Sequence, residues 1–248
     1  MKKKVWISLS GIIAMVILAS VYYNYFSNPS EFLSEDEMID IINESQYGFD
    51  SLEVLDTIYL DDTHVFVPFA QDQIYGTSFW IWEKRNWEMK GFNTMADPYL
   101  WQLDPNDPNT FYVTWNLDPA NDLSQIDLYL MNRRGFRSSD YNQTNTYTPG
   151  VQLQHQIETN LDEASYGVER LPEDWIAFLE SYLEVEGAKS TDDFFSHHLH
   201  MSSLSYGWIP RRSNGEMTDF VNKPNGSSSR SGRFYGESIF WISEDELE

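Results

Sequence analysis

The chain has 248 residues and carries 39 acidic residues against 16 basic ones, a formal net charge of −23. This balance excludes nucleic acid as a partner, because binding DNA or RNA depends on lysine and arginine side chains that neutralise phosphates. The chain also has no cysteine, which excludes disulfide bonds and thioether-linked lipids.

The N-terminus combines positive charge with an uncharged run. Three lysines at positions 2–4 precede a stretch without charge from residue 5 to residue 26. About 20 apolar residues span a bilayer as a helix, and positive flanks stay in the cytoplasm. We therefore expect a cytoplasmic tail at residues 1–4, a transmembrane anchor at residues 5–27 and a single extracytoplasmic domain at residues 28–248. Without the three lysines, 13 basic residues face 39 acidic ones, so the expected net charge of that domain is −26.

A cleaved signal peptide is the alternative interpretation of the same segment. Cleavage sites need small residues two positions apart, whereas Ile17 and Leu18 precede the small residues Ala19 and Ser20. The aromatic residues that follow suit the outer membrane interface. The pattern favours an anchor that stays attached.

The first helix of the outer domain is predicted from Glu35 to Tyr47. Ser34 and Glu37 have the spacing of a capping box, in which each residue satisfies a free backbone group of the helix start. Leu33 can pack on the first turn from outside. The helix is expected next to the membrane.

Short runs rich in β-branched and aromatic residues follow the first helix. They predict strands at 53–60, 64–70, 77–83, 86–92, 110–117, 124–131 and 151–158. Strands joined by such short links pair antiparallel, because a parallel crossover needs a dozen or more residues. We expect a meander with tight turns, among them Lys84-Arg85.

Two helices are predicted after the strands. Pro172 suits a first helical position, and the apolar residues of the next turns lie on one face: Trp175, Phe178, Leu179, Tyr182 and Leu183. Ser190 or Thr191 can cap a second helix that runs to His200. Short strands at 207–209 and 238–242 enclose a Ser/Gly-rich loop, 225–232, which is expected to be mobile. The predicted class is α+β: an antiparallel β-meander with an N-terminal helix and two C-terminal helices, preceded by one transmembrane helix.

A histidine cluster is the strongest candidate for chemistry. On a helix, Asp193, His197 and His200 would share one face, and two imidazoles with a carboxylate suit zinc or another transition metal. Three ligands would leave a position open for water. The alternative is a polar helix end, where histidines complement the helix dipole.

Acid-rich loops at 104–109 and 118–122 offer oxygen ligands for calcium, but they lack the glycine-centred spacing of an EF-hand. Proline-rich turns account for the same composition. Most aromatic residues alternate within strands, which is typical of core positions. The expectation is no cofactor, with zinc or weakly bound calcium as the alternatives.

The sequence predicts no particular reaction. It contains no Gly-x-Ser-x-Gly or Ser-x-x-Lys motif, which disfavours acyl-transfer enzymes of those designs. We therefore expect a non-catalytic, membrane-anchored interaction or ligand-sensing module of a bacterial cell envelope, with the membrane and an envelope or membrane protein as its partners. The alternative is an anchored hydrolase that acts on wall polymer or peptide, with a metal or a carboxylate pair.

Overall fold

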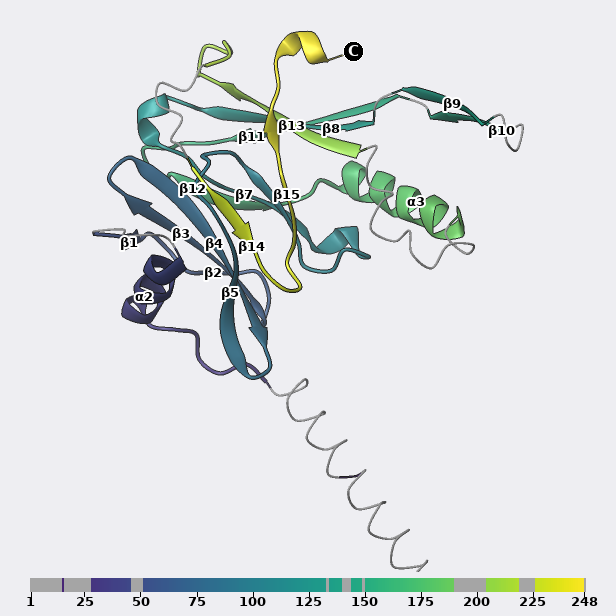
Figure 1. Cartoon of the computed structure of the whole chain (residues 1–248). Helices are drawn as coiled ribbons and strands as arrows, with labels where there is room; N and C mark the ends of the chain where they lie inside the picture. Colours follow the sequence, from purple (N-terminus) through teal and green to yellow (C-terminus); the bar gives the residue numbers. More distant parts are fainter. Residues whose placement is uncertain are drawn as a thin grey trace, which may run out of the picture.

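The computed structural model describes residues 15, 28–45, 51–132, 134–139, 144–148, 150–189, 204–218 and 226–247 (Figure 1). Within these ranges the chain is mostly β-structure, with about 45% of residues in strands and 19% in helices. The helices with defined bounds are α2 (Glu35–Ser45), α3 (Glu173–Lys189) and the short 3-10 helices η1 (Pro108–Thr110), η2 (Pro119–Asn121) and η5 (Glu244–Glu246).

The first sheet is built around three strands joined by hairpins: β3 (His64–Gln71), β4 (Ile74–Glu83) and β5 (Asn86–Asn93). They pair antiparallel, as their short links predict. One edge is completed by β1 (Glu53–Val54) and β2 (Ile58–Tyr59), and the other by β14 (Ser228–Arg230). The predicted strands 64–70, 77–83 and 86–92 are thus present, but their meander ends at β5.

Two four-stranded sheets follow. The middle sheet has the order β12 (Tyr166–Arg170), β7 (Phe111–Asn116), β6 (Tyr99–Gln102), β15 (Tyr235–Ser238). The third sheet has the order β11 (Val151–Glu158), β8 (Gln125–Asn132), β13 (Leu204–Arg211), β16 (Phe240–Trp241), and its last pair is parallel. β9 (Gly135–Ser139) and β10 (Thr144–Thr148) form a separate hairpin.

The sheets are stacked because apolar side chains cover both faces of the central strands. On one face of the first sheet, Val65 and Trp80 pack with α2. On the opposite face, Phe66 and Phe79 pack against aromatic residues of the middle sheet. The other face of the middle sheet and the third sheet enclose the largest apolar cluster, to which α3 contributes Trp175. The order is therefore α2, first sheet, middle sheet, third sheet, and Figure 1 shows it.

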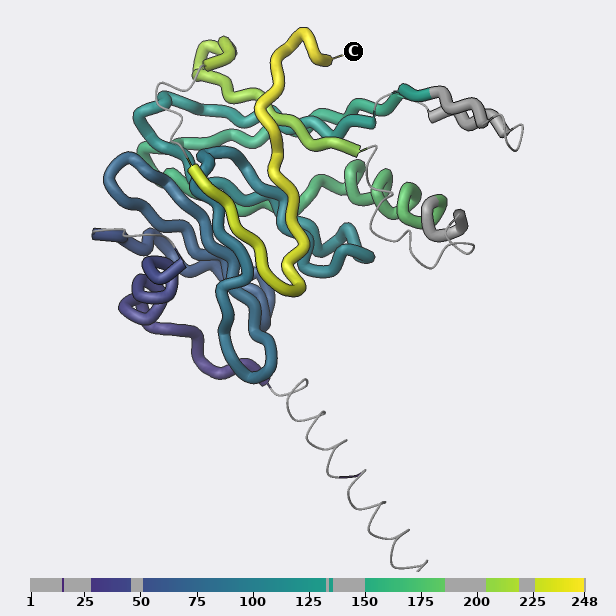
Figure 2. Tube along the Cα trace, viewed as in Figure 1, coloured from purple at the N-terminus to yellow at the C-terminus, as the bar shows by residue number. Residues whose placement is uncertain are grey.

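One C-terminal segment joins all three sheets. We call residues 226–247 the strap. It adds β14 to the first sheet, β15 to the middle sheet and β16 to the third sheet. In Figure 2 the strap is the yellow tube, which begins beside the blue strands of the first sheet and ends at the third sheet. The prediction of a mobile loop at 225–232 is therefore wrong for residues 228–230. These residues form the edge strand β14, which pairs with β5.

The two α-helices begin where the sequence predicts. Ser34 caps α2, but its hydroxyl donates to the Glu37 carboxylate (2.8 Å) instead of accepting from the backbone, and its backbone N–H donates to the same oxygen (2.9 Å). In α3, Trp175 and Leu179 are buried, whereas Phe178 is only half-buried. The predicted stripe of α3 is therefore correct at its centre and partly exposed at its margin.

The predicted α+β class, a meander with an N-terminal helix and two C-terminal helices, is wrong, because the part of the chain that the structure describes is built mainly of antiparallel sheets. The described residues are mainly strand, because segments with little apolar alternation, such as β12 and β14, pair with edges that other strands offer. The second C-terminal helix expected at 191–200 lies outside the described residues. Among the described residues, none of the helices combines the length and the apolar composition that crossing a bilayer requires. Residues 5–27, where the transmembrane helix was predicted, are described only at Met15.

Candidate ligand-binding pocket

The pocket begins with an unusual turn between β4 and β5. Lys84 and Arg85 form its two central positions, and both have positive φ angles, 53° and 67°. Such two-residue turns favour Asn-Gly, because other side chains are strained at positive φ. Non-glycine residues in this conformation concentrate at binding sites and turns. The strained turn places two cations at the tip of the hairpin.

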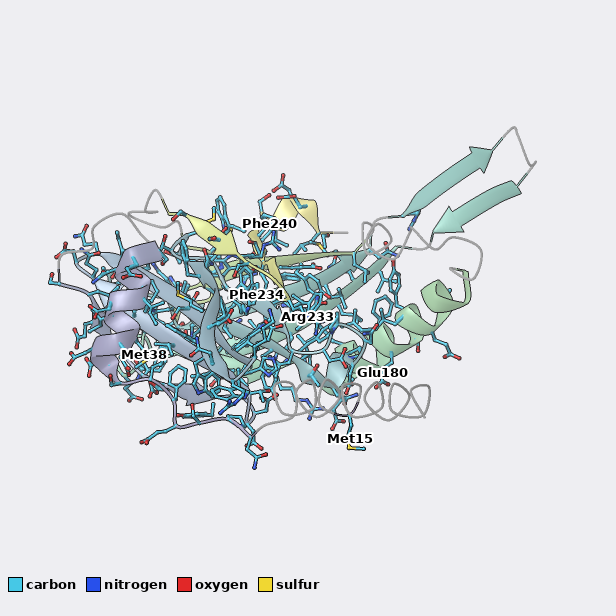
Figure 3. All side chains as sticks on the ribbon, turned by 60° about the horizontal axis from the view of Figure 1, so that its bottom comes forward. Met15, Met38, Glu180, Arg233, Phe234 and Phe240 are labelled. Atoms are coloured by element: carbon cyan, nitrogen blue, oxygen red, sulfur yellow. The ribbon has the colours of Figure 1, made fainter. Side chains whose placement is uncertain are left out.

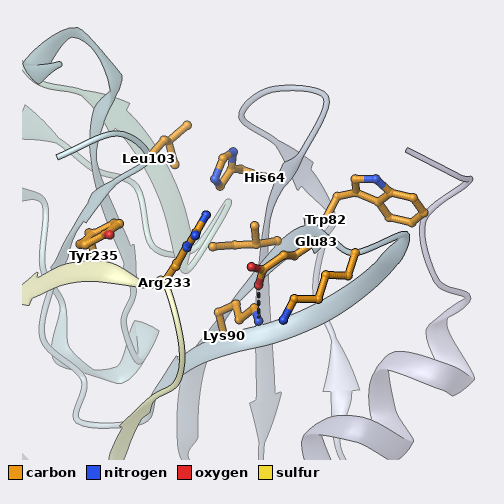
Figure 4. Close-up of a pocket in the computed structure, with 9 residues that line it drawn as sticks. His64, Trp82, Glu83, Lys90, Leu103, Arg233 and Tyr235 are labelled. Carbon is orange, nitrogen blue, oxygen red and sulfur yellow. Dashed lines mark ion pairs between the residues drawn. The ribbon is translucent and has the colours of Figure 1, made fainter. Parts of the chain in front are cut away.

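The cavity beside this hairpin has a volume of about 260 Å³. Figure 4 shows that three parts of the chain line it: the first sheet contributes His64, Ile81, Trp82, Glu83, Lys84 and Lys90, the segment after β6 contributes Leu103, and the strap contributes Arg233 and Tyr235. The first sheet, the middle sheet and the strap therefore meet at this pocket.

The charge of the lining is opposite to that of the chain. Lys84, Lys90 and Arg233 provide three cations, and Glu83 is the one carboxylate among the lining residues. The whole chain, in contrast, has a net charge of −23. Lys84 and Arg233 come from segments far apart in the chain, and the fold brings them to one cavity, which makes this cavity a binding-site candidate.

Lys90 holds the floor of the pocket through two ion pairs. Its side chain is 7% exposed, and its Nζ lies 2.8 Å from Glu83 Oε2 and 2.6 Å from Glu88 Oε2. Burial would lower the pKa of Lys90, but the hydrogen bonds to the two carboxylates outweigh burial and raise it. The hydrogen bond from Lys90 in turn lowers the pKa of Glu83. The ammonium group and the Glu83 carboxylate therefore both stay charged near neutral pH.

Arg233 brings a cation from the strap. Its side chain is anchored indirectly, because the next residue, Phe234, is buried among aromatic rings of the first and middle sheets. The charge of Arg233 contributes to lowering the pKa of Glu83. Figure 4 shows the guanidinium group between Tyr235 and His64. Arginine offers several donors in a planar fork, which matches carboxylate and phosphate oxygens.

His64 lines the pocket next to the guanidinium group of Arg233 (Figure 4). Its Nδ1 lies 2.9 Å from both carboxylate oxygens of Asp61, and its ring packs edge-on against Trp101. Burial would raise the pKa of Asp61, but the hydrogen bonds and charge of His64, together with hydrogen bonds from Thr63, hold it at about 2. The Asp61 carboxylate therefore fixes the orientation of the His64 ring through Nδ1.

The residues predicted for a metal site cannot be compared with this pocket. Asp193, His197 and His200 lie outside the described residues. Within the described ranges, no three His, Cys, Asp or Glu side chains are placed to hold a metal ion together. In the acid-rich loops, Asp104, Asp107 and Asp118 accept hydrogen bonds from backbone N–H groups two residues further on, which is the geometry of turns.

Sequence reasoning missed the pocket, although two of its signals are visible. Lys84-Arg85 was recognised as a turn, and Arg233 follows a Ser/Gly-rich stretch. Their approach depends on the pairing of β14 with β5, which joins segments more than a hundred residues apart. Nothing local predicts that pairing.

Comparison of the chain with protein-family models, with curated protein sequences and with solved structures gives no match. The geometry and charge of the pocket are therefore the features that indicate a function.

Proposed function

We propose that this protein is a membrane-anchored, extracytoplasmic ligand-binding or sensing module of a bacterial cell envelope, and that its pocket binds a small anionic ligand without catalysis. One observation carries the proposal: Lys84, Lys90 and Arg233 of a strongly acidic chain line one cavity. With Glu83 counted, the three cations leave the lining with a net charge of 3 − 1 = +2, and a net positive cavity raises the local concentration of anions.

The shape and lining of the pocket support a small ligand. Pockets for drug-sized molecules have volumes of about 300–1,000 Å³, and this cavity, at about 260 Å³, lies just below that range. Part of the pocket wall is apolar and is formed by Ile81, Trp82 and Leu103. An apolar wall lowers the local dielectric constant and strengthens the charged contacts. Lys90 is already paired with two carboxylates, so Lys84 and Arg233 would supply the donors for the ligand.

The proposed location rests on the sequence of the N-terminus. Lysines at positions 2–4 and the uncharged run that follows them favour a cytoplasmic start and an outer domain from residue 28 onward. Protease added to intact spheroplasts should digest that domain. Digestion only after lysis would place the domain in the cytoplasm and reject this part of the proposal.

Ligand binding is tested by thermal unfolding of the full chain in a non-ionic detergent. A ligand that binds only the folded state raises Tm as its concentration passes Kd. We expect inorganic phosphate and glycerol 3-phosphate to raise Tm, and we expect Lys84→Gln combined with Arg233→Gln to abolish the rise. Arg134→Gln combined with Arg212→Gln removes the same charge away from the pocket and should keep it.

Two results would reject the anionic-ligand proposal. One is no change in Tm at concentrations that saturate a millimolar site. The other is an equal rise in the pocket variant and in the control variant, which would indicate a general effect of salt on a highly charged chain.

A further inference from the structure

The start of the outer domain is attached to the hairpin that carries the pocket. Trp87 Nε1 of β5 donates a hydrogen bond to the carbonyl of Ser30 (3.2 Å). The ring of Phe32 packs edge-on against Trp87, with 4.9 Å between centroids, and against Trp80 (5.8 Å). In Figure 1 the described chain begins, in purple, beside the lower end of this hairpin. Residue 28 and the Lys84-Arg85 turn therefore lie at the same end of the molecule.

This attachment sets the distance between the hairpin and the point where the chain would leave the membrane. An extended chain covers at most about 3.5 Å per residue, so Ser30 lies within about 7 Å of Asn28. Tyr59, which is largely exposed, packs against Phe32 at the same end. Tyrosine, tryptophan, lysine and arginine are the side chains that concentrate at membrane interfaces.

We propose that the pocket binds the phosphate group of an outer-leaflet lipid headgroup, and so holds the hairpin end of the domain against its own bilayer. This inference rests on the proposed function and names its ligand. Lys84 and Arg233 would donate to the phosphate oxygens, and Arg85 at the tip of the turn would face neighbouring headgroups. A free phosphate ester has the same chemistry, so the experiment must separate the two sources.

Electrostatics gives a reason for such a contact. The part of the chain after the three N-terminal lysines has a net charge of −26 and would be repelled from an anionic leaflet. Repulsion between exposed charges is screened over about 8–10 Å at physiological salt, so the charges close to the cavity matter most. The nearby carboxylates are held in pairs there: Glu83 and Glu88 contact Lys90, and Asp61 contacts His64. Lys84 and Arg233 are then the cations of the lining that would contact an anionic headgroup.

The absence of cysteine allows a direct test with the full chain. Asn86→Cys places a label beside the hairpin turn, and Ser213→Cys places it in the exposed loop after β13, at the opposite end in Figure 1. The labelled chains would be reconstituted in phosphatidylglycerol nanodiscs that contain a lipid with a nitroxide headgroup. We expect strong quenching at position 86 and little at position 213.

The pocket variant separates headgroup binding from simple tethering. Lys84→Gln combined with Arg233→Gln should lower quenching at position 86 to the level that the tether through Trp87 and Ser30 alone maintains, whereas Arg134→Gln combined with Arg212→Gln should not lower it. Added glycerol 3-phosphate should compete and also reduce the quenching. The same pocket variant should bind glycerol 3-phosphate at least about a hundredfold more weakly, as expected for the loss of two charge-assisted hydrogen bonds.

The outcomes distinguish this inference from the proposed function. Binding of glycerol 3-phosphate without quenching at position 86 overturns the lipid inference and leaves the anionic pocket standing. Quenching that is unchanged in the pocket variant also overturns the inference, because the hairpin would then be near the bilayer without using the pocket. Failure of both binding and quenching overturns the inference together with the proposed function.

Discussion

Two consecutive arginines show how burial decides the energetic role of a charged residue. Arg211 donates from Nε to Asp127, whose side chain is 1% exposed, and its Nη2 lies 2.9 Å from Glu244 Oε1. Arg212 lies 4.0 Å from Asp122, whose side chain is 89% exposed. Removing the partner of a buried charge leaves that charge uncompensated, whereas exposed pairs contribute little.

We predict that Arg211→Gln lowers the free energy of unfolding by about 3 kcal/mol or more. The neighbouring change Arg212→Gln should lower it by less than about 1 kcal/mol. Chemical denaturation of both variants in one detergent measures the difference. Equal effects of the two substitutions would show that the Asp127 pair is not buried in the folded protein.

The pair of Asp61 with His64 predicts a dependence of stability on acid. The pKa of Asp61 is about 2 in the folded protein, below its ordinary value of 3.8. A lowered pKa stabilises the fold above the ordinary value, and that contribution is lost as pH falls from about 4 to about 2. Asp61→Asn should therefore destabilise the protein at pH 6 and converge with the parent near pH 2.

The size of the Asp61 effect should be below about 1 kcal/mol, because its side chain is 45% exposed and solvent screens the pair. Asp62→Asn removes a carboxylate from the same turn and is the matched control. A constant difference between Asp61→Asn and the parent from pH 6 to pH 2 would contradict the assigned role.

At the scale of elements, the sequence predicts which residues form the apolar face of α3, but it does not predict how deeply each of them is buried. Trp175 is 1% exposed and belongs to the cluster between the middle and third sheets. Phe178 packs against this cluster from the side and stacks near Tyr182 at 6.2 Å. Helical spacing identifies the apolar face, but only the packed sheets determine which residue lies at its centre.

We predict that Trp175→Ala lowers the free energy of unfolding by about 3–5 kcal/mol. Phe178→Ala should cost clearly less, about 1–2 kcal/mol, because part of that ring already contacts solvent. Thermal or chemical unfolding of both variants measures the order. A larger loss for Phe178→Ala would mean that α3 is rotated relative to the sheets.

The same distinction between local and distant information explains the fold prediction. The hairpins β3–β4 and β4–β5 were correct, because their apolar runs and short turns are local features. The three-sheet stack was missed, because β6 leaves the meander and the free edge of β5 is taken by Ser228–Arg230 of the strap. A serine-rich segment carries no strand signal of its own, and the pocket depends on that placement.

At the scale of the whole molecule, the strap holds three sheets together through a few anchors. Phe234 is 8% exposed and packs among Phe79, Tyr99 and Trp101. Phe240, six residues later, is 65% exposed. Figure 3 shows Phe234 in the interior beside Arg233, and Phe240 at the surface. The strap is thus fixed where it crosses from the first sheet to the middle sheet.

We predict that Phe234→Ala lowers the free energy of unfolding by about 3–5 kcal/mol, and that it weakens anion binding because Arg233 loses its anchor. Phe240→Ala, on the same segment, should stay within about 0.5 kcal/mol of the parent. Denaturation curves and phosphate titrations of both variants check this pair. Similar stability of the two variants would show that the strap is not anchored at Phe234.

The central claim is that an anion binds where the strap meets the β4–β5 hairpin, and hydrogen exchange tests it most directly. The full chain would be exchanged with and without inorganic phosphate, because binding slows the local opening of the segments that hold a ligand. We predict slower exchange at residues 231–235 and 82–90, with little change in α3. Unchanged exchange in both pocket segments, or slowing confined to other regions, would contradict the account.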